Sequence, residues 1–329
     1  MEPKFLCFGE LLGRLSPEGD QRILQTNRFS LTYSGSEANV AMLLGNLGMD
    51  VSYVTKLPQN DVGEAALRAL RAHNVQTGHV LRGGARMGLY FVEKGMSART
   101  SNLIYDRVGS SFASISPDEL DWDELFRGVT HFHFTGITPA LSDACAQACL
   151  DACRAAKEKQ IVISCDLNYR AKLWSVEKAN AVLATLLPYV DILLSNNAEI
   201  EQLFGIHTEN YEELADELKK RFGIESVGTA VYSIRDHGTL LDWAGVLSYK
   251  GQLVQSRNRY TIQVLDPIGG GDSFSAAVLY GLARQMPLQE CVDFATAASV
   301  LKFTISGDVD DITPADVQKL LHSKDFLNR

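Results

Sequence analysis

The sequence predicts an α/β protein in which a mostly parallel sheet is covered by helices on both faces and carries a small inserted β-sheet. Two observations lead to this fold class. Strand patterns alternate with helical patterns along most of the 329 residues, an order typical of a three-layer α/β/α domain. Two β-rich intervals interrupt the alternation. Because no linker or internal repeat sets them apart, we expect an insertion and not a terminal domain.

The alternation starts in the first residues of the chain. Apolar strand patterns at 4–12 and 51–55 are each followed by a helical pattern, at 36–47 and 61–75. In the helical segments the apolar residues recur at intervals of three and four, which places them on one face. These segments therefore predict the first two strand–helix pairs of the main sheet.

The β-rich intervals are residues 12–35 and 86–112. The second contains MGLYFVEKG and NLIYDRV, which alternate in polarity and have turn residues between them, as expected of half-buried strands. We therefore expect a small separate sheet from the two intervals. The main domain would then comprise residues 1–11, 36–85 and 113–329.

The α/β rhythm resumes near residue 129. The expected strands are 129–137, 161–168, 191–197 and 261–265, and the expected helices are 144–159, 176–187, 198–204 and 272–284, with two more helical segments near the C-terminus. In an open α/β sheet, ligands bind at the carboxyl ends of the strands. Polar residues and glycines follow the strands at 9–10, 135–137, 166–170, 195–199 and 266–272.

Composition excludes several classes of protein. The formal net charge is −9 and no Lys/Arg cluster occurs, which argues against a nucleic-acid partner. No apolar run approaches the roughly 20 residues that span a bilayer. The N-terminus carries an acid at Glu2 and lacks a long apolar stretch, so we expect no secretory signal. Six cysteines in a chain of this length do not resemble a disulfide framework, which favours a cytoplasmic location.

Two groups of potential metal ligands stand out in the sequence. Cys145, Cys149 and Cys153 form one stripe of a predicted helix, and His131 and His133 share one face of a predicted strand. A metal or redox site is one interpretation. Because neither group has a complete set of ligands at metal-binding spacing, we expect the cysteines to be core residues and the histidines to be core or pocket-lining residues.

The segment DPIGGGDSF at 266–274 lies between an expected strand and an expected helix. Amides at a helix N-terminus lack internal partners and lie at the positive end of the helix dipole. Glycines at 269–271 would let an anion, most naturally a phosphate, approach this backbone. Asp272 could then accept the proton of an attacking hydroxyl, or it could merely cap the helix. The segment is neither GxxxxGK[ST] nor GxGxxG.

This segment resembles the C-terminal signature of the ribokinase-like (PfkB) carbohydrate kinases, approximately D-x-x-G-A-G-D. Asp266, Gly269, Gly271 and Asp272 match it, and Gly270 replaces the usual alanine. Glycine leaves the turn backbone possible, so the departure is mild.

Further segments agree with the family in order along the chain. SGSEANVA at 34–41 resembles its GGxxxNVA segment, with Ser34 in place of the first glycine. Residues 166–170 match D-x-N-x-R, and 196–199 match N-x-x-E. The resemblance spans nearly the whole chain.

Within this family the chain is most similar to the 2-keto-3-deoxygluconate kinases. The supporting segments are 9–17 (GELLGRLSP), 88–90, 105–107, 168–170 and the DxIGGGDSF form of the signature. Such a substrate is a sugar acid, and its carboxylate requires cationic or several hydrogen-bonding partners. Arg107 and Arg170 could each present a planar fork to it.

The resemblance implies an ATP- and Mg²⁺-dependent kinase that phosphorylates the terminal hydroxyl of 2-keto-3-deoxy-D-gluconate, with a monovalent cation as a further candidate cofactor. It also implies that 12–35 and 86–112 form a lid over the sugar and a dimer contact. Asp272 would be the general base, and the N–H groups of Gly269, Gly270 and Gly271 would stabilise the moving phosphoryl group. The implied sugar-binding residues are Gly35, Asn39, Tyr90, Tyr105, Arg107, Gly136, Ile137, Arg170 and Asp272.

Asn196 and Glu199 would organise Mg²⁺, through water because Mg²⁺ retains much of its hydration. The family's glycine-rich element near residue 230 is reduced here to Gly238. The implied nucleotide contacts are Asn196, Ser233, Arg235, Gly238, Gly269, Gly271 and Ala298.

Structural interpretations compete with these roles. Arg107 could be a solvated surface charge, Arg170 could pair with Asp166, and Glu199 could be an acid favoured by a helix dipole. Asn39 could simply bond backbone groups. Two other functions also stay open: a kinase of fructose or another neutral sugar, and a non-catalytic sugar or nucleotide sensor, against which the presence of Asp272 and the glycine run argues.

Overall fold

A nine-stranded sheet forms the centre of the molecule and confirms the predicted fold class. The structure is a computed structural model and describes residues 2–96, 99–235 and 240–322. The strands of this sheet are β1 (Lys4–Phe8), β4 (Asp50–Val54), β9 (His131–Thr135), β10 (Val162–Asp166), β11 (Ile192–Ser195), β12 (Ser226–Arg235), β13 (Leu240–Tyr249), β14 (Gln252–Gln255) and β15 (Tyr260–Gln263).

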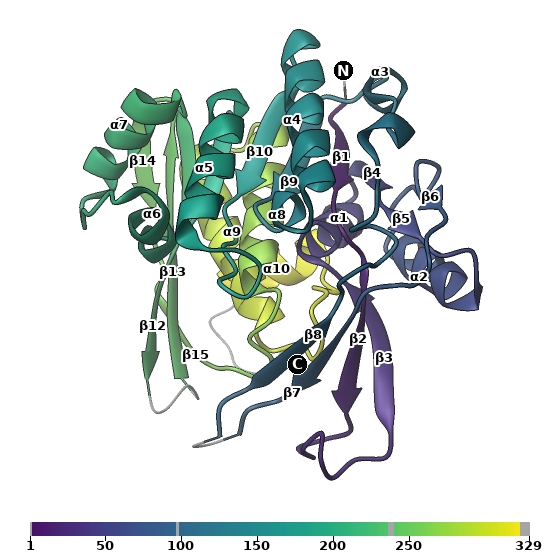
Figure 1. Cartoon of the computed structure of the whole chain (residues 1–329). Helices are drawn as coiled ribbons and strands as arrows, with labels where there is room; N and C mark the ends of the chain where they lie inside the picture. The colour runs from purple at the N-terminus through teal and green to yellow at the C-terminus, as the bar shows by residue number, and fades with distance from the viewer. Residues whose placement is uncertain (1, 97–98, 236–239, 323–329) are drawn as a thin grey trace.

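Helices cover both faces of this sheet, as Figure 1 shows. They are α1 (Ser36–Asn46), α2 (Asp61–Ala72), α3 (Trp122–Leu125), α4 (Asp143–Glu158), α5 (Val176–Leu186), α6 (Asn197–Phe204), α7 (Tyr211–Phe222), α8 (Gly270–Ala283), α9 (Leu288–Lys302) and α10 (Pro314–His322). On β1, Phe5 and Cys7 join the core shared with α1, α8 and α9, whereas Leu6 and Phe8 join the core shared with α4 and α5. The strand is therefore apolar on both faces, as a parallel strand between two helical layers must be.

The strands β4, β1, β9, β10, β11 and β12 pair in parallel, so their carboxyl ends meet along one edge. The other side of the sheet is antiparallel: β13 pairs with β12, β14 and β15. On this antiparallel side the expected strand 261–265 overlaps β15, whereas β13, β14 and the helix α7 have no counterpart among the expected elements.

A separate four-stranded sheet lies below the carboxyl ends of the parallel strands (Figure 1). Its strands are β2 (Leu12–Pro17), β3 (Phe29–Ser34), β7 (Leu89–Glu93) and β8 (Asn102–Asp106), in the order β3-β2-β7-β8. All four fall within the β-rich intervals identified in the sequence. A two-stranded sheet of β5 (Lys56–Leu57) and β6 (Leu81–Arg82) completes the described strands.

The first predicted strand, residues 4–12, is divided between the two sheets. β1 ends at Phe8 and β2 begins at Leu12 in the small sheet. Gly9 permits the transition because a Cβ there would lie 2.3 Å from the carboxyl group of Glu37. The expected boundary between residues 11 and 12 therefore agrees with the change of sheet, whereas the single expected strand over 4–12 is wrong, because Gly9 and Glu10 interrupt it.

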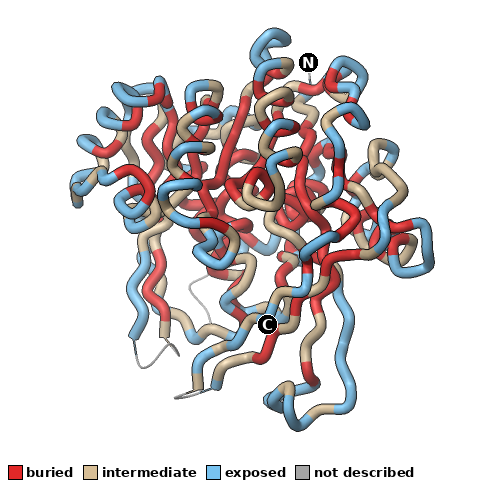
Figure 2. The backbone as a smooth tube through the Cα atoms, viewed as in Figure 1, coloured by how far each residue is buried: buried red, intermediate tan, exposed pale blue. Residues whose placement is uncertain are grey.

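The cysteine stripe belongs to the core, as predicted. Cys145, Cys149 and Cys153 are completely buried in α4, in the densely buried interior that Figure 2 shows in red. His133 is also completely buried, its Nδ1 lies 3.0 Å from Ser164 Oγ, and burial lowers its pKa to about 3. His131 stacks on Phe5. Within the described ranges, His, Cys, Asp and Glu side chains form no group of three that could hold a metal ion.

The helices of the described residues are too short or too polar to cross a membrane.

Candidate active site

The glycine run forms the N-terminus of α8. Gly269 is the N-cap residue, with φ 88° and ψ −7°, a left-handed conformation that glycine adopts readily. A Cβ at Gly269 would lie 2.0 Å from the carbonyl oxygen of Asp308, and a Cβ at Gly270 would lie 2.2 Å from the ring of Phe303. The turn therefore needs glycine for both conformation and space. It presents the first amides of a helix toward a cavity, an arrangement suited to an anion.

Asp272 does not cap α8. Its Oδ1 accepts a 2.6 Å hydrogen bond from Ser36 Oγ, and its Oδ2 accepts a 2.7 Å bond from Asn39 Nδ2. Asn168 Nδ2 in turn donates to Ser36 Oγ at 2.6 Å. Residues from the start of α1 and the end of β10 thus aim the carboxylate away from its own helix backbone, which contradicts the capping interpretation.

Burial raises the pKa of the Asp272 carboxyl above its ordinary value, and the hydrogen bonds from Ser36 and Asn39 and the charge of Arg170 act in the opposite direction. A raised pKa makes a carboxylate a stronger proton acceptor. Asp272 also lines two adjoining cavities, one between the two sheets and one toward β12 and β13. This position suits a group that deprotonates a hydroxyl in one cavity while a phosphate donor binds in the other cavity.

The smaller cavity lies between the four-stranded sheet and the main domain. Eight predicted sugar-binding residues line it: Gly35, Asn39, Tyr90, Tyr105, Arg107, Ile137, Arg170 and Asp272. Gly136 does not line it; its N–H donates to Asp166 O at 2.8 Å, and a Cβ there would lie 2.2 Å from Leu167 O. Gly136 therefore lets two strand ends approach each other and positions Ile137 indirectly.

Arg107 and Arg170 differ in their surroundings. Arg107 is buried, and its Nε and Nη2 donate to the same oxygen of Glu10 at 2.8 and 2.5 Å. Its charge is therefore neither solvated nor free. Arg170 is exposed, lines both cavities, and donates from Nη1 to Tyr169 O at 3.0 Å. The expected alternative for Arg170, a pair with Asp166, is absent among the ion pairs of the described residues.

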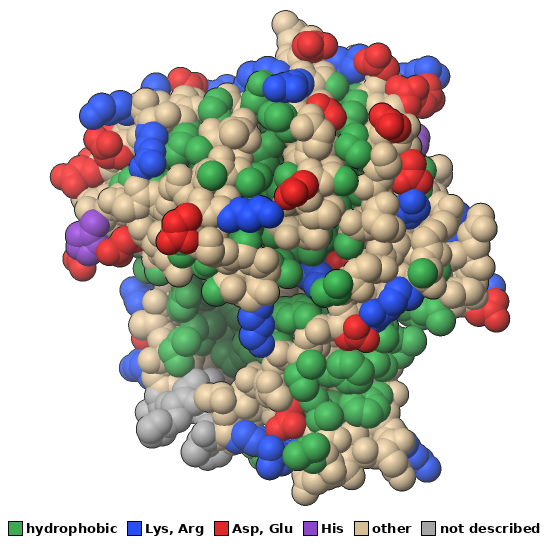
Figure 3. Space-filling view, in the orientation of Figure 1, with side chains coloured by type: hydrophobic (Ala, Val, Ile, Leu, Met, Phe, Trp, Pro, Cys, Tyr) green, Lys and Arg blue, Asp and Glu red, His purple; other side chains and the backbone are tan. Residues whose placement is uncertain are grey.

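The larger cavity has a volume of about 500 Å³, and Figure 3 shows the surface hollowed beside the four-stranded sheet. Gly269, Gly271, Asn196 and Glu199, which the sequence assigns to a nucleotide and metal site, all line this cavity. Asp166, which was not assigned a role from the sequence, lines it as well.

Asp166, Glu199 and Asp272 all line this cavity, although these three carboxylates do not form a group that could hold a metal ion directly. Burial raises the pKa of Asp166 well above its ordinary value, and the charges of Glu199 and Asp272 raise it further. Burial also raises the pKa of Glu199, against the lowering effect of Arg170. Mutual repulsion of this kind is relieved by a divalent cation, so the residues fit hydrated Mg²⁺. The Asn196 side chain caps α6 by accepting the Glu199 N–H at 3.0 Å, which fixes the direction of Glu199.

The predicted nucleotide contacts on β12 are not brought into the cavity. Ala230, Tyr232 and Ile234 line it, and because alternate residues of a strand face opposite sides, Ser233 and Arg235 point away. Both bond to Asp242, Ser233 at 3.2 Å and Arg235 at 2.5 Å. Gly238 lies outside the described residues.

Ala298 is completely buried in α9 and is part of the main core. The described walls of the cavity near that helix are larger side chains, Trp243 and Phe303, whose rings pack edge to face with centroids 4.9 Å apart.

Comparisons with known proteins agree with this geometry. The model of the pfkB family carbohydrate kinases matches residues 2–315. A 2-dehydro-3-deoxygalactonokinase of Haloferax volcanii is 31% identical over 99% of this chain and 98% of its own. A 2-dehydro-3-deoxygluconokinase of Thermoproteus tenax is 28% identical over 96% of this chain and 93% of its own. The crystal structure of a 2-dehydro-3-deoxygluconokinase from Thermotoga maritima is 39% identical, with a TM-score of 0.94 over 98% of this chain and 100% of that chain.

Proposed function

The chain belongs to the pfkB family of carbohydrate kinases, and from that premise we propose that it phosphorylates the terminal hydroxyl of a 2-keto-3-deoxy sugar acid, with 2-keto-3-deoxy-D-gluconate as the first candidate. One observation carries the choice of substrate class. The charge of Arg107 is balanced by Glu10, whereas Arg170 forms no ion pair among the described residues and lines both cavities, so its guanidinium can accept a further partner. A substrate carboxylate supplies the missing partner.

In the proposed reaction, the terminal hydroxyl oxygen attacks the γ-phosphorus of ATP, the bond to the leaving ADP oxygen breaks, and Asp272 accepts the hydroxyl proton. The amides of the glycine turn stabilise charge on the transferring phosphoryl group. Mg²⁺, bound through water near Glu199 and Asp166, would neutralise phosphate charge. The four-stranded sheet covers the sugar and excludes water, which would otherwise compete as the acceptor.

The test is turnover with ATP and Mg²⁺ on a panel of acceptors: the gluconate- and galactonate-derived 2-keto-3-deoxy acids, fructose and ribose. We expect measurable turnover of at least one of the two acids. We also expect that acid to have the highest kcat/KM of the panel. A higher kcat/KM for fructose would favour a neutral-sugar kinase, and binding of an acid without any phosphorylated product would favour a sensor.

Repeating the assay without K⁺ tests the candidate monovalent cation. A cytoplasmic location is part of the proposal and suits six free cysteines.

Replacing Arg170 by Gln is expected to reduce kcat/KM for the sugar acid by about 10- to 100-fold, the typical loss when a charged hydrogen bond is removed. The reduction for a neutral acceptor should be several-fold smaller, because only the acid has a charge to pair. Lys172→Gln is the matched control, since Lys172 is an exposed cation two residues away that does not line the smaller cavity. Equal losses for both acceptors would contradict the assignment.

We also propose that the four-stranded sheet pairs with a second copy of the chain. Its outer face is apolar: Leu15, Leu31, Phe91 and Ile104 occupy neighbouring positions across three strand pairs. Leu31 and Ile104 are 44% and 46% exposed, and Figure 3 shows hydrophobic side chains gathered over this sheet. An exposed apolar patch of this kind is typical of an interaction surface.

Leu31→Glu is therefore expected to convert a dimer into a monomer, measured by sedimentation velocity at micromolar concentration. Val62→Glu is the control, because Val62 is 41% exposed but lies on α2, away from this sheet. A monomeric wild-type protein, or a Leu31→Glu variant that still dimerises, would rule out this interface.

A further inference from the structure

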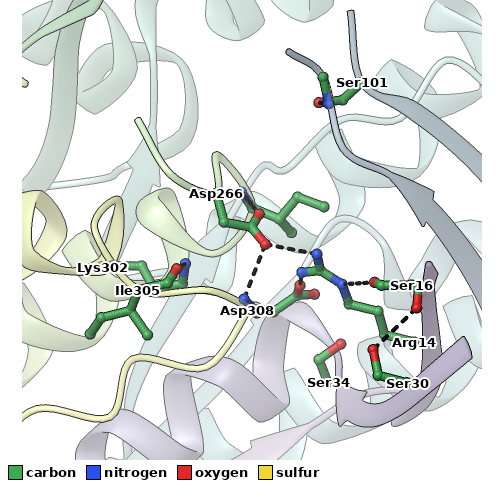
Figure 4. Close-up of polar contacts among 12 residues, drawn as sticks. Arg14, Ser16, Ser30, Ser34, Ser101, Asp266, Lys302, Ile305 and Asp308 are labelled. Atoms are coloured by element: carbon green, nitrogen blue, oxygen red, sulfur yellow. Dashed lines mark hydrogen bonds and ion pairs between the residues drawn. The ribbon is translucent and has the colours of Figure 1, made fainter. Parts of the chain in front are cut away.

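Arg14 lies on β2, on the inner face of the four-stranded sheet, and is 5% exposed. Its Nη2 donates to Asp266 Oδ2 at 2.7 Å, its Nη1 pairs with Asp308 Oδ1, and its Nε donates to Ser16 Oγ at 3.0 Å. Figure 4 shows the guanidinium between the two carboxylates. One lid residue thus joins two segments of the main domain.

Both of these segments shape the glycine turn. Asp266 Oδ1 accepts the Ile268 N–H at 3.2 Å, and Asp266 Oδ2 accepts the Gly307 N–H at 3.0 Å. The carbonyl oxygen of Asp308 packs against Gly269 so closely that a Cβ would lie 2.0 Å away. A displacement of either carboxylate would therefore be passed to the amides that face the phosphoryl group.

The same network reaches the sugar cavity. The Tyr90 hydroxyl donates to Asp308 Oδ2 and lies 2.6 Å from Ser34 Oγ. Tyr90 and Ser34 both line the smaller cavity. A continuous, buried series of polar contacts therefore runs from the sugar site through Asp308 and Arg14 to the turn.

Charge makes Arg14 hard to replace. Asp266 and Asp308 are both buried, beside a site that must receive a phosphate. Lys302, also completely buried, donates to Ile305 O at 3.2 Å, and burial lowers its pKa despite the nearby Asp266, Asp308 and Asp310. Lys302 alone cannot balance two carboxylates, and an unpaired negative charge here would repel the incoming phosphate.

We propose that Arg14 is a positioning residue that couples sugar binding to the geometry of the phosphoryl-binding turn; this inference rests on the proposed kinase function. A sugar that orders β2 and β7 also holds Arg14 between its two carboxylates. The turn is then already ordered when the nucleotide binds, so less conformational entropy is lost in the second step. Arg14 itself touches neither reactant.

The coupling is measured by isothermal titration calorimetry as the ratio of Kd values for a non-hydrolysable ATP analogue with Mg²⁺, without and with saturating 2-keto-3-deoxygluconate. For the wild-type protein we expect the sugar to tighten nucleotide binding by about 10-fold, within the usual range of coupling between two sites. Arg14→Lys keeps the charge but cannot bridge both carboxylates. It should bring the ratio close to one while the Kd of the analogue alone changes little.

Arg86→Lys is the matched control, because Arg86 also belongs to the lid region but pairs with Asp106 at an exposed site. It should keep the wild-type ratio. If Arg14→Lys does not fold, Tyr90→Phe breaks the network without leaving a buried charge unpaired and should also reduce the ratio.

A purely structural role for Arg14 would lower the melting temperature of Arg14→Lys and leave its ratio unchanged, and that result would overturn the inference. A wild-type enzyme that phosphorylates the acid but shows no coupling would overturn the inference alone. A wild-type protein that phosphorylates no sugar acid would instead overturn the proposed function.

Discussion

Asp272→Asn is expected to lower kcat for the sugar acid by about 10³-fold, within the range that a positioned general base contributes, while the Kd of the acid changes little. The reason is that asparagine keeps the size of the side chain but cannot accept the proton of the attacking hydroxyl. The carboxylate is held by Ser36 and Asn39 at the point where the two cavities meet. Steady-state kinetics and calorimetry on the same preparation separate the two effects.

Ser36→Ala provides the control for the role of the carboxylate itself. The hydrogen bond from Ser36 lowers the pKa of Asp272, against the raising effect of burial. Its loss should raise that pKa, so the acidic limb of the kcat/KM profile should move to higher pH, because the base acts only when ionised. An Asp272→Asn variant with wild-type kcat, or a Ser36→Ala profile that moves to lower pH, would contradict this mechanism.

Much of the main domain could be predicted because its signals are local. The parallel strands β4, β9, β10 and β11 are apolar runs that lead into a helix with apolar residues three and four apart on one face, and both patterns are visible within about a dozen residues. On the antiparallel side, β13 and β14 were not expected because they follow β12 directly, with no helix between these strands. The α7 sequence carries a comparable helical signal at Leu214, Leu218 and Phe222, but it was not identified.

Residues of the candidate site could be predicted where they belong to segments that occur in the family order along the chain. They could not be predicted where their role depends on a side-chain contact with a residue far away in the sequence. Asp272 and Glu199 could be placed because their segments occur in the family order. That Glu10 neutralises Arg107, or that Arg14 pairs with Asp266 across 252 residues, depends on long-range packing. Ser233 and Arg235 were wrongly expected to face the cavity because a strand's polarity pattern does not reveal which face carries the ligand.

Gly269→Ala is expected to reduce both catalysis and stability. A methyl group at this position would have to avoid the carbonyl oxygen of Asp308, 2.0 Å away, and the backbone would keep a φ of +88° that alanine rarely adopts. Since the main chain must move, the first amides of α8 lose their direction. We expect kcat to fall by about 10²- to 10³-fold, as for the loss of one preorganised donor.

The cost of the backbone conformation can be separated from the loss of the phosphoryl site. Gly251 also has a positive φ, +82°, but no described atom lies within 4 Å of a Cβ placed there, and it lies at the turn between β13 and β14. Gly251→Ala should therefore lower the free energy of unfolding by about 1–2 kcal/mol, the cost of a left-handed alanine, and leave kcat unchanged. Urea denaturation and kinetics of both variants make the comparison. If Gly269→Ala behaves like Gly251→Ala in both measurements, the turn is only a conformational feature and its amides do not hold the phosphoryl group.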